Sequence, residues 1–96
     1  MRFSDALDLC MKGRKIRRLD WNGKGMFVYY IPPHNVKVDD WENRSGNTPL
    51  TYDELDKGWV RIAGHFDMYN AQGIRIIGWV ASQTDLSSDQ WEVLEE

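Results

Sequence analysis

The sequence predicts an α+β fold in which a short N-terminal helix packs on a small antiparallel β-sheet of hairpins. Three observations lead to this prediction. The first dozen residues carry apolar side chains at helical spacing, the later apolar segments are short and rich in β-branched and aromatic residues, and glycine- and asparagine-rich turns separate those segments. Because 96 residues is the length of one ordinary domain, we expect 1–96 to form a single domain.

Residues 4–12 are expected to form the helix. Its apolar side chains recur at the spacing of one buried face: Phe3, Ala6, Leu7 and Cys10. Ser4 is a favourable N-cap, because its hydroxyl can accept a hydrogen bond from an orphan backbone N–H. Gly13 suits the left-handed position that often follows a helix.

Two strands, 14–19 and 26–31, are expected next. The second is aromatic and β-branched and is followed by two prolines. Between the strands lies WNGKG, and Asn-Gly is the strongest two-residue hairpin signal because both positions tolerate positive φ. The stretch therefore has two interpretations, a hairpin turn or a loop that binds a planar, charged small molecule.

The rest of the chain alternates short strands with polar turns. We interpret 34–58 as a long surface excursion that contains a short strand at 36–38 and a helical turn capped by Thr51 and ended by Gly58. The later expected elements are strands at 59–62 and 66–70, a turn at 70–73, a returning strand at 74–81, a helical turn within 84–91 capped by Ser82 or Thr84, and a final strand at 91–94.

Composition limits the classes of function. The formal net charge of −3 argues against a protein that binds nucleic-acid polymers through a broad positive field. The single cysteine excludes a disulfide framework and metal sites built on cysteine pairs, and no apolar run approaches the ~20 residues of a membrane span. We therefore expect a soluble protein of a reducing cytoplasm, without membrane association.

No constellation of residues specifies catalysis. His34 and His65 are isolated in the sequence, and Cys10 falls on the apolar helix face, where a core residue is more common than a nucleophile. No pair of acidic residues stands out as a general acid and base. We therefore predict no catalytic residues, no metal site and no cofactor.

Two segments, together with a basic run, carry candidate binding residues. In WNGKG, Trp21 offers a stacking face, Gly23 and Gly25 leave backbone N–H groups accessible, and Lys24 supplies charge, although the spacing is not that of a P-loop. The basic run before this stretch comprises Lys12, Arg14, Lys15, Arg17 and Arg18. Its members suit phosphate binding, but any single one is more often a solvated surface residue.

The second segment is SQTD at 82–85, four polar residues directly after an expected strand. Its hydroxyls, amide and carboxylate are the groups that read a ribose or a base edge. The alternative is a helix start in which Ser82, Thr84 and Asp85 cap backbone groups.

WNGKGMF at 21–27 and WVASQTD at 79–85, followed by Asp89 and Trp91, resemble the motifs of a small phage and prophage family, Thoeris anti-defence protein 2. The order and separation of the motifs fit, so the resemblance spans nearly the whole chain. Gln90 separates Asp89 from Trp91, where the family more often has the acid directly before the tryptophan. The segment 39–58 has no counterpart in the pattern.

The resemblance implies a sponge, not an enzyme. Members of this family look like tight binders of a cyclic ADP-ribose signal made by a bacterial TIR-domain defence protein, which they hold intact so that the Thoeris effector is not activated. Relatives form homotetramers with pockets at subunit interfaces, and some also bind cyclic oligonucleotides. The implied place of action is the cytoplasm of the infected bacterial host.

The resemblance also suggests roles for residues. Trp21 or Phe27 would stack on adenine, and Lys24 with Arg14 or Arg18 would neutralise the pyrophosphate. Hydroxyl and base-edge contacts would come from Asn22 and the SQTD segment. The predicted ligand-binding residues are Arg18, Trp21, Asn22, Gly23, Lys24, Phe27, Ser82, Gln83, Thr84 and Asp85. Two other functions compatible with the sequence are an enzyme that cleaves the same signal and a protein-interaction module that acts on a host protein.

Overall fold

The computed structural model describes the backbone of residues 1–45 and 49–95, and the side chains of these residues except 42–45. The chain divides into two compact units. Unit 1 comprises Met1–Pro32 and His65–Glu96, and unit 2 comprises Pro33–Gly64. Among the helices in the described part of the chain, none is both long enough and apolar enough to cross a bilayer.

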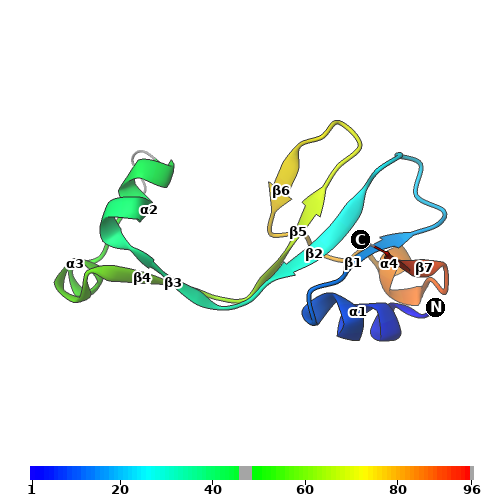
Figure 1. Cartoon of the computed structure of the whole chain (residues 1–96), viewed down its shortest axis with the longest axis horizontal. Helices are drawn as coiled ribbons and strands as arrows, with labels where there is room; N and C mark the ends of the chain where they lie inside the picture. Colours follow the sequence, from blue (N-terminus) through cyan, green and yellow to red (C-terminus); the bar gives the residue numbers. More distant parts are fainter. Residues whose placement is uncertain (46–48, 96) are drawn as a thin grey trace. The chain divides into compact units, whose positions relative to one another are not determined.

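Unit 1 contains a five-stranded sheet in the order β6-β5-β2-β1-β7, and every neighbouring pair is antiparallel (Figure 1). Its strands are β1 (Lys15–Arg18), β2 (Phe27–Ile31), β5 (His65–Tyr69), β6 (Arg75–Ile77) and β7 (Trp91–Leu94). Helix α1 (Phe3–Met11) packs against β1, β2 and β7, and α4 (Gln83–Ser87) precedes β7. The predicted α+β class, with an N-terminal helix on an antiparallel sheet, is confirmed.

The ends of α1 agree only in part with the prediction. The helix begins at Phe3, its N-cap is Arg2, and no side chain caps it, so the assignment of Ser4 as N-cap is wrong. Including Phe3 in the helix lets its ring reach Trp91, with 5.1 Å between ring centroids, and this packing outweighs a single cap hydrogen bond. Gly13 has a φ of +104°, which confirms the left-handed position after the helix.

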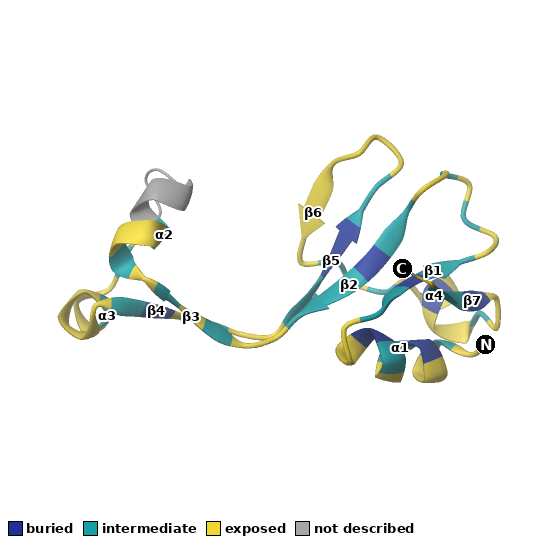
Figure 2. Cartoon of the chain, viewed as in Figure 1, coloured by how far each residue is buried: buried dark blue, intermediate teal, exposed yellow. Residues whose placement is uncertain are grey.

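The core of unit 1 lies between α1 and the sheet (Figure 2). Its buried members are Ala6, Cys10, Ile16, Val28, Met68 and Trp91. Burial raises the pKa of the Cys10 thiol to about 11, so the thiol is neutral at physiological pH. The expectation that Cys10 is a core residue is confirmed.

The Asn-Gly hairpin turn is not formed. β1 ends at Arg18 and β2 begins at Phe27, so a loop joins them, and neither Asn22 nor Gly23 has the positive φ that the tight turn requires. Trp21 is instead held by packing and hydrogen bonding to the C-terminal part of unit 1. The local turn preference is overridden by these long-range contacts.

The second predicted hairpin is present. Asn70 Oδ1 accepts hydrogen bonds from the backbone N–H groups of Gln72 and Ile74, and Gly73 has a φ of +77°. The returning strand is shorter than predicted, because β6 ends at Ile77 and Gly78 has a φ of +85°.

Unit 2 contains an antiparallel pair, β3 (His34–Lys37) and β4 (Trp59–Ile62), and two helices, α2 (Val38–Ser45) and α3 (Tyr52–Lys57). A reciprocal capping box between Thr51 and Glu54 begins α3, and Gly58 ends it in the left-handed conformation, as predicted. α2 was not predicted, because its sequence, VDDWENRS, is strongly polar and contains only two apolar residues. The segment interpreted as a surface excursion is therefore largely regular structure, apart from 46–48, which lie outside the described residues.

Candidate functional site

The SQTD segment forms the beginning of α4. Ser82 is the N-cap, and its Oγ accepts a hydrogen bond from the Asp85 backbone N–H at 3.0 Å. In return, Asp85 Oδ2 accepts the Ser82 backbone N–H at 2.9 Å. This is a capping box, the structural alternative considered for these residues.

The carboxylate of Asp85 also connects α4 to the loop between β1 and β2. Its Oδ1 accepts a hydrogen bond from Arg18 Nη1 at 2.8 Å and from Trp21 Nε1 at 3.4 Å. Asp85 is buried. Burial alone would raise its pKa, but the hydrogen bonds from Ser82, Arg18 and Trp21 outweigh it, and the pKa of Asp85 lies below its ordinary value. The two predicted motifs therefore meet within one chain.

The ring of Trp21 is held by Trp91 as well as by the hydrogen bond to Asp85. It packs edge-to-face on Trp91, with centroids 5.3 Å apart and an interplanar angle of 78°. Trp91 contacts Phe3 and Trp79 in turn, and its own Nε1 donates to the Asp85 carbonyl oxygen at 2.8 Å. Trp21 remains half-buried, so the packing orders the indole without covering it completely.

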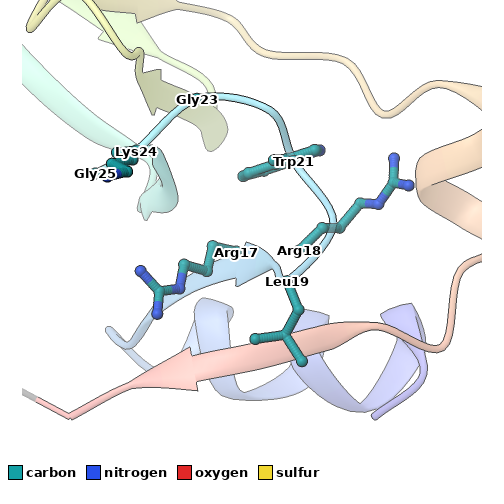
Figure 3. A pocket seen from close by; sticks show the side chains of 7 residues that line it. All are labelled: Arg17, Arg18, Leu19, Trp21, Gly23, Lys24 and Gly25. Carbon is teal, nitrogen blue, oxygen red and sulfur yellow. The ribbon is translucent and has the colours of Figure 1, made fainter.

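A pocket of about 380 Å³ opens beside Trp21 (Figure 3). Its lining residues are Arg17, Arg18, Leu19, Trp21, Gly23, Lys24 and Gly25. The volume lies within the range typical of small-molecule sites. Sequence analysis placed Arg18, Trp21, Gly23 and Lys24 together in a binding site, and the structure does bring them together around this pocket.

The cations of the pocket have different surroundings. Arg17 and Arg18, consecutive on β1, point their guanidinium groups in opposite directions (Figure 3). Arg17 is paired with Glu92, its cross-strand neighbour on β7. Lys24 is exposed and enters no ion pair within the described part of the chain.

Arg18 is bound by carboxylates on two sides. Its Nε and Nη2 donate to Asp20 Oδ1 and Oδ2 at 3.1 and 2.8 Å, and its Nη1 donates to Asp85. Hydrogen bonds to Asp20 and then Asp85 raise the pKa of Arg18 above its ordinary value. The hydrogen bond from Arg18 lowers the pKa of Asp20 below its ordinary value.

Glycine is favoured at positions 23 and 25 of the loop for two different physical reasons. A Cβ on Gly23 would lie 2.5 Å from Met26 Sδ and 2.6 Å from the Ala71 Cβ, so close packing requires glycine there. Gly25 has open space around it but a φ of +76°, so its backbone conformation favours glycine. Of the two, Gly25 is the one with room for another molecule to approach.

Some predicted ligand-binding residues lie elsewhere or point to solvent. Phe27 is stacked on Tyr69, with centroids 5.1 Å apart and an interplanar angle of 16°, and Lys15 Nζ lies 4.8 Å from its centroid. It is not part of the pocket lining. Asn22, Gln83 and Thr84 are exposed, and Ser82 uses its hydroxyl for the helix cap.

Two pocket-lining residues, Arg17 and Leu19, were not among the predicted ligand-binding residues, and neither was Asp20, whose carboxylate contacts Arg18. Gly25 was recognised with Gly23 as a glycine of the WNGKG segment. Arg17 was recognised only as a member of a basic run. Consecutive residues of a strand point to opposite faces, so Arg17 and Arg18 could have been assigned to different faces from the sequence. That assignment requires knowing where β1 ends, which the sequence did not show.

Comparison with known proteins adds independent information. A model of the Thoeris anti-defense 2-like domain family matches residues 1–94. The chain belongs to this family. Thoeris anti-defense 2 of Bacillus phage SP01 is 26% identical over 97 residues, which cover 98% of this chain and 94% of that relative. The resemblance inferred from WNGKGMF and SQTD is thereby confirmed, and the Thoeris anti-defense 2-like domain spans both units.

Proposed function

We propose that this protein is a phage anti-defence sponge that binds a cyclic ADP-ribose-type immune signal and sequesters it without degrading it. Depletion of the signal would block activation of the Thoeris effector in the cytoplasm of the infected bacterial host. Family membership supports the anti-defence role. The pocket beside Trp21 supports the sequestering mechanism.

The observation that carries the proposal is the connection between the two motifs. Asp85 holds both Trp21 and Arg18, and these residues line a pocket that also contains Lys24 and two glycines. Such a site offers an indole face for a base, cations for phosphate groups and accessible backbone at Gly25 for close approach. Because the indole is already fixed by Trp91, little conformational entropy would be lost on binding.

The electrostatics favour binding over cleavage. Asp20 and Asp85, the carboxylates that contact Arg18, both have a pKa below the ordinary value and are ionised at neutral pH. A carboxylate acting as general acid needs a raised pKa. Both carboxylates also already accept hydrogen bonds from Arg18, so each is engaged as an ion-pair partner of that guanidinium.

We further propose that the ligand is enclosed by more than one chain. Leu19, Lys24 and Gly25 in the pocket lining are exposed, so one chain leaves part of a bound nucleotide in solvent. The homotetramer with interfacial pockets that the family resemblance implies would enclose it. A sponge needs a dissociation constant near the nanomolar range, about −12 kcal/mol, which an enclosed, preorganised site can supply.

The proposal is tested with a thermal-shift panel of cyclic ADP-ribose isomers and cyclic oligonucleotides, followed by recovery of the small molecule from heat-denatured complex. We expect at least one cyclic ADP-ribose isomer to stabilise the protein by about 4 kcal/mol at a thousandfold excess over its dissociation constant. The recovered ligand should be chemically unchanged. Hydrolysed ligand would indicate an enzyme, and no stabilisation by any compound would favour a protein-interaction module.

A further inference from the structure

The guanidinium of Arg18 has an inner and an outer contact. The inner one, Nη1 to Asp85, joins two side chains that are each 10% exposed. The outer one is a two-point contact in which Nε and Nη2 donate to the two oxygens of Asp20, whose side chain is 50% exposed. This two-point geometry is the one with which arginine also binds phosphate.

Carboxylates outnumber the cation around the Arg18 guanidinium. This group points away from the guanidinium of Arg17 (Figure 3) and contacts both Asp20 and Asp85. Together the three groups carry one formal negative charge. An anionic ligand therefore gains little from the site unless one carboxylate moves away from its arginine.

Asp20 is the carboxylate best able to move. Asp85 also caps α4 and is buried, and Glu92 lies within β7, 33% exposed and held by its strand. Asp20 lies in the loop between β1 and β2 and is the most exposed of the three. Rotation of its side chain into solvent would uncover the outer edge of Arg18 while Asp85 keeps the guanidinium in place.

We infer that Asp20 is a displaceable competitor for the anion site, whose carboxylate occupies the outer edge of Arg18 until a phosphate group of the ligand replaces it. This inference rests on the proposed nucleotide-binding function and adds a mechanism of selectivity to it. A phosphate or pyrophosphate can offer two oxygens and at least one full negative charge to Nε and Nη2 of Arg18, whereas a neutral nucleoside cannot displace the Asp20 carboxylate. The site is thereby selective for phosphorylated ligands.

The test compares the affinity of inorganic pyrophosphate for the wild type, Asp20→Asn and Asp8→Asn by isothermal titration calorimetry at fixed ionic strength. Asp8 is an exposed residue of α1 outside the pocket lining, so Asp8→Asn makes the same change in net charge. We expect Asp20→Asn to bind pyrophosphate roughly three- to fivefold more tightly than Asp8→Asn, the scale of one exposed ion pair. Equal or weaker binding by Asp20→Asn would overturn the inference, because removing a carboxylate that competes with the anion for Arg18 must strengthen pyrophosphate binding.

A second measurement uses the wild type and does not depend on the folding of a variant. Carboxyl ¹³C resonances give the pKa of Asp20 with and without saturating pyrophosphate, and Asp85 serves as internal reference. Displacement should raise the pKa of Asp20 toward its ordinary value, because it loses the Arg18 hydrogen bonds that lower it. An unchanged pKa of Asp20 would contradict displacement.

The two proposals fail in different ways. If no cyclic ADP-ribose isomer binds but pyrophosphate binds more tightly to Asp20→Asn, the sponge is refuted and the competitor role stands. If a cyclic ADP-ribose isomer binds and Asp20→Asn weakens pyrophosphate binding, the sponge stands and the competitor role is refuted.

Discussion

The two units of the chain are stabilised by different means. Unit 1 buries a cluster of apolar side chains between α1 and a five-stranded sheet. In unit 2, among the residues whose side chains are described, only Val60 is a buried apolar residue. Unit 2 depends more on local devices, namely the Thr51 capping box, the Gly58 C-cap and the β3–β4 ladder. The site beside Trp21 belongs to unit 1, where a well-packed core can hold its geometry.

Replacing Trp91 should have the largest effect. Trp91 is 1% exposed, and its ring contacts Phe3, Trp21 and Trp79. We expect Trp91→Ala to lower the free energy of unfolding by about 3 to 5 kcal/mol. For matched side chains, Val28→Ala in unit 1 should cost more than Val60→Ala in unit 2, which should lose only about 1 to 2 kcal/mol. Urea denaturation of the three variants measures these losses, and similar losses in the two valine variants would contradict the contrast between the units.

Neutralising Asp85 should have the next largest effect. Asp85→Asn keeps an oxygen for the Ser82 N–H but loses the charge that Arg18 and Trp21 contact, so we expect a loss of about 1 to 3 kcal/mol. The exposed Asp89→Asn is the control and should change stability by less than about 0.5 kcal/mol.

This effect of Asp85 should depend on pH. The lowered pKa means that Asp85 stabilises the fold above its unfolded-state pKa and that this stability is lost as the pH falls through the folded-state pKa. Wild type should therefore lose stability below about pH 4, and the difference between wild type and Asp85→Asn should shrink there. If the difference in free energy of unfolding between wild type and Asp85→Asn were constant from neutral to acidic pH, the charge of Asp85 would have no role in stability.

Alanine substitutions at Gly23 and Gly25 should distinguish the effect of steric crowding from that of backbone strain. Gly23→Ala forces its new Cβ against Met26 and Ala71, so we expect about 1 to 3 kcal/mol of destabilisation and a displaced loop. Gly25→Ala meets no neighbour but adopts a positive φ, and should cost about 1 kcal/mol. Crystal structures of the two variants would show the displacement. An undisturbed loop in Gly23→Ala would mean that the packing there is loose.

Removing the cap of α3 should have the smallest effect. Thr51→Ala loses one half of the reciprocal capping box, which is worth about 1 kcal/mol. Amide hydrogen exchange should show faster exchange in α3 and β4 and unchanged protection in β1, β2 and β5. Equal acceleration in both units would show that they unfold as one.

The strands and α1 were predictable because their signals are local. Apolar periodicity located α1, and the β-branched and aromatic runs located β2 and β5 within one residue at each end. α2 was not predictable by this means, because its eight residues are mostly polar and include only two apolar side chains. The turn signal of Asn22-Gly23 was misleading, since contacts of Trp21 with Trp91 and Asp85 decide the loop.

The sequence predicted which segments form the site, but it did not predict what each residue of the site does. The assignment of WNGKG and SQTD to one binding site predicted that the two segments lie together, and Asp85 does connect them. The sequence did not indicate that Asp85 would hold Trp21 and Arg18 in place or that Phe27 would stack on Tyr69. The Asp85 contacts join side chains that are 64 and 67 residues apart, and the Phe27–Tyr69 stack depends on the register of β2 with β5. No local pattern encodes either.

The most direct test of the central claim is the affinity of a cyclic ADP-ribose isomer for wild type, Trp21→Ala and Trp59→Ala, measured by calorimetry with recovery of the bound molecule. If the pocket beside Trp21 holds the signal intact, Trp21→Ala should bind roughly 10- to 100-fold more weakly, the scale of one lost base–indole stack. Trp59→Ala in unit 2 should bind as wild type does, and the recovered molecule should be unchanged. Full affinity in Trp21→Ala, or recovery of a cleaved product from wild type, would contradict the claim.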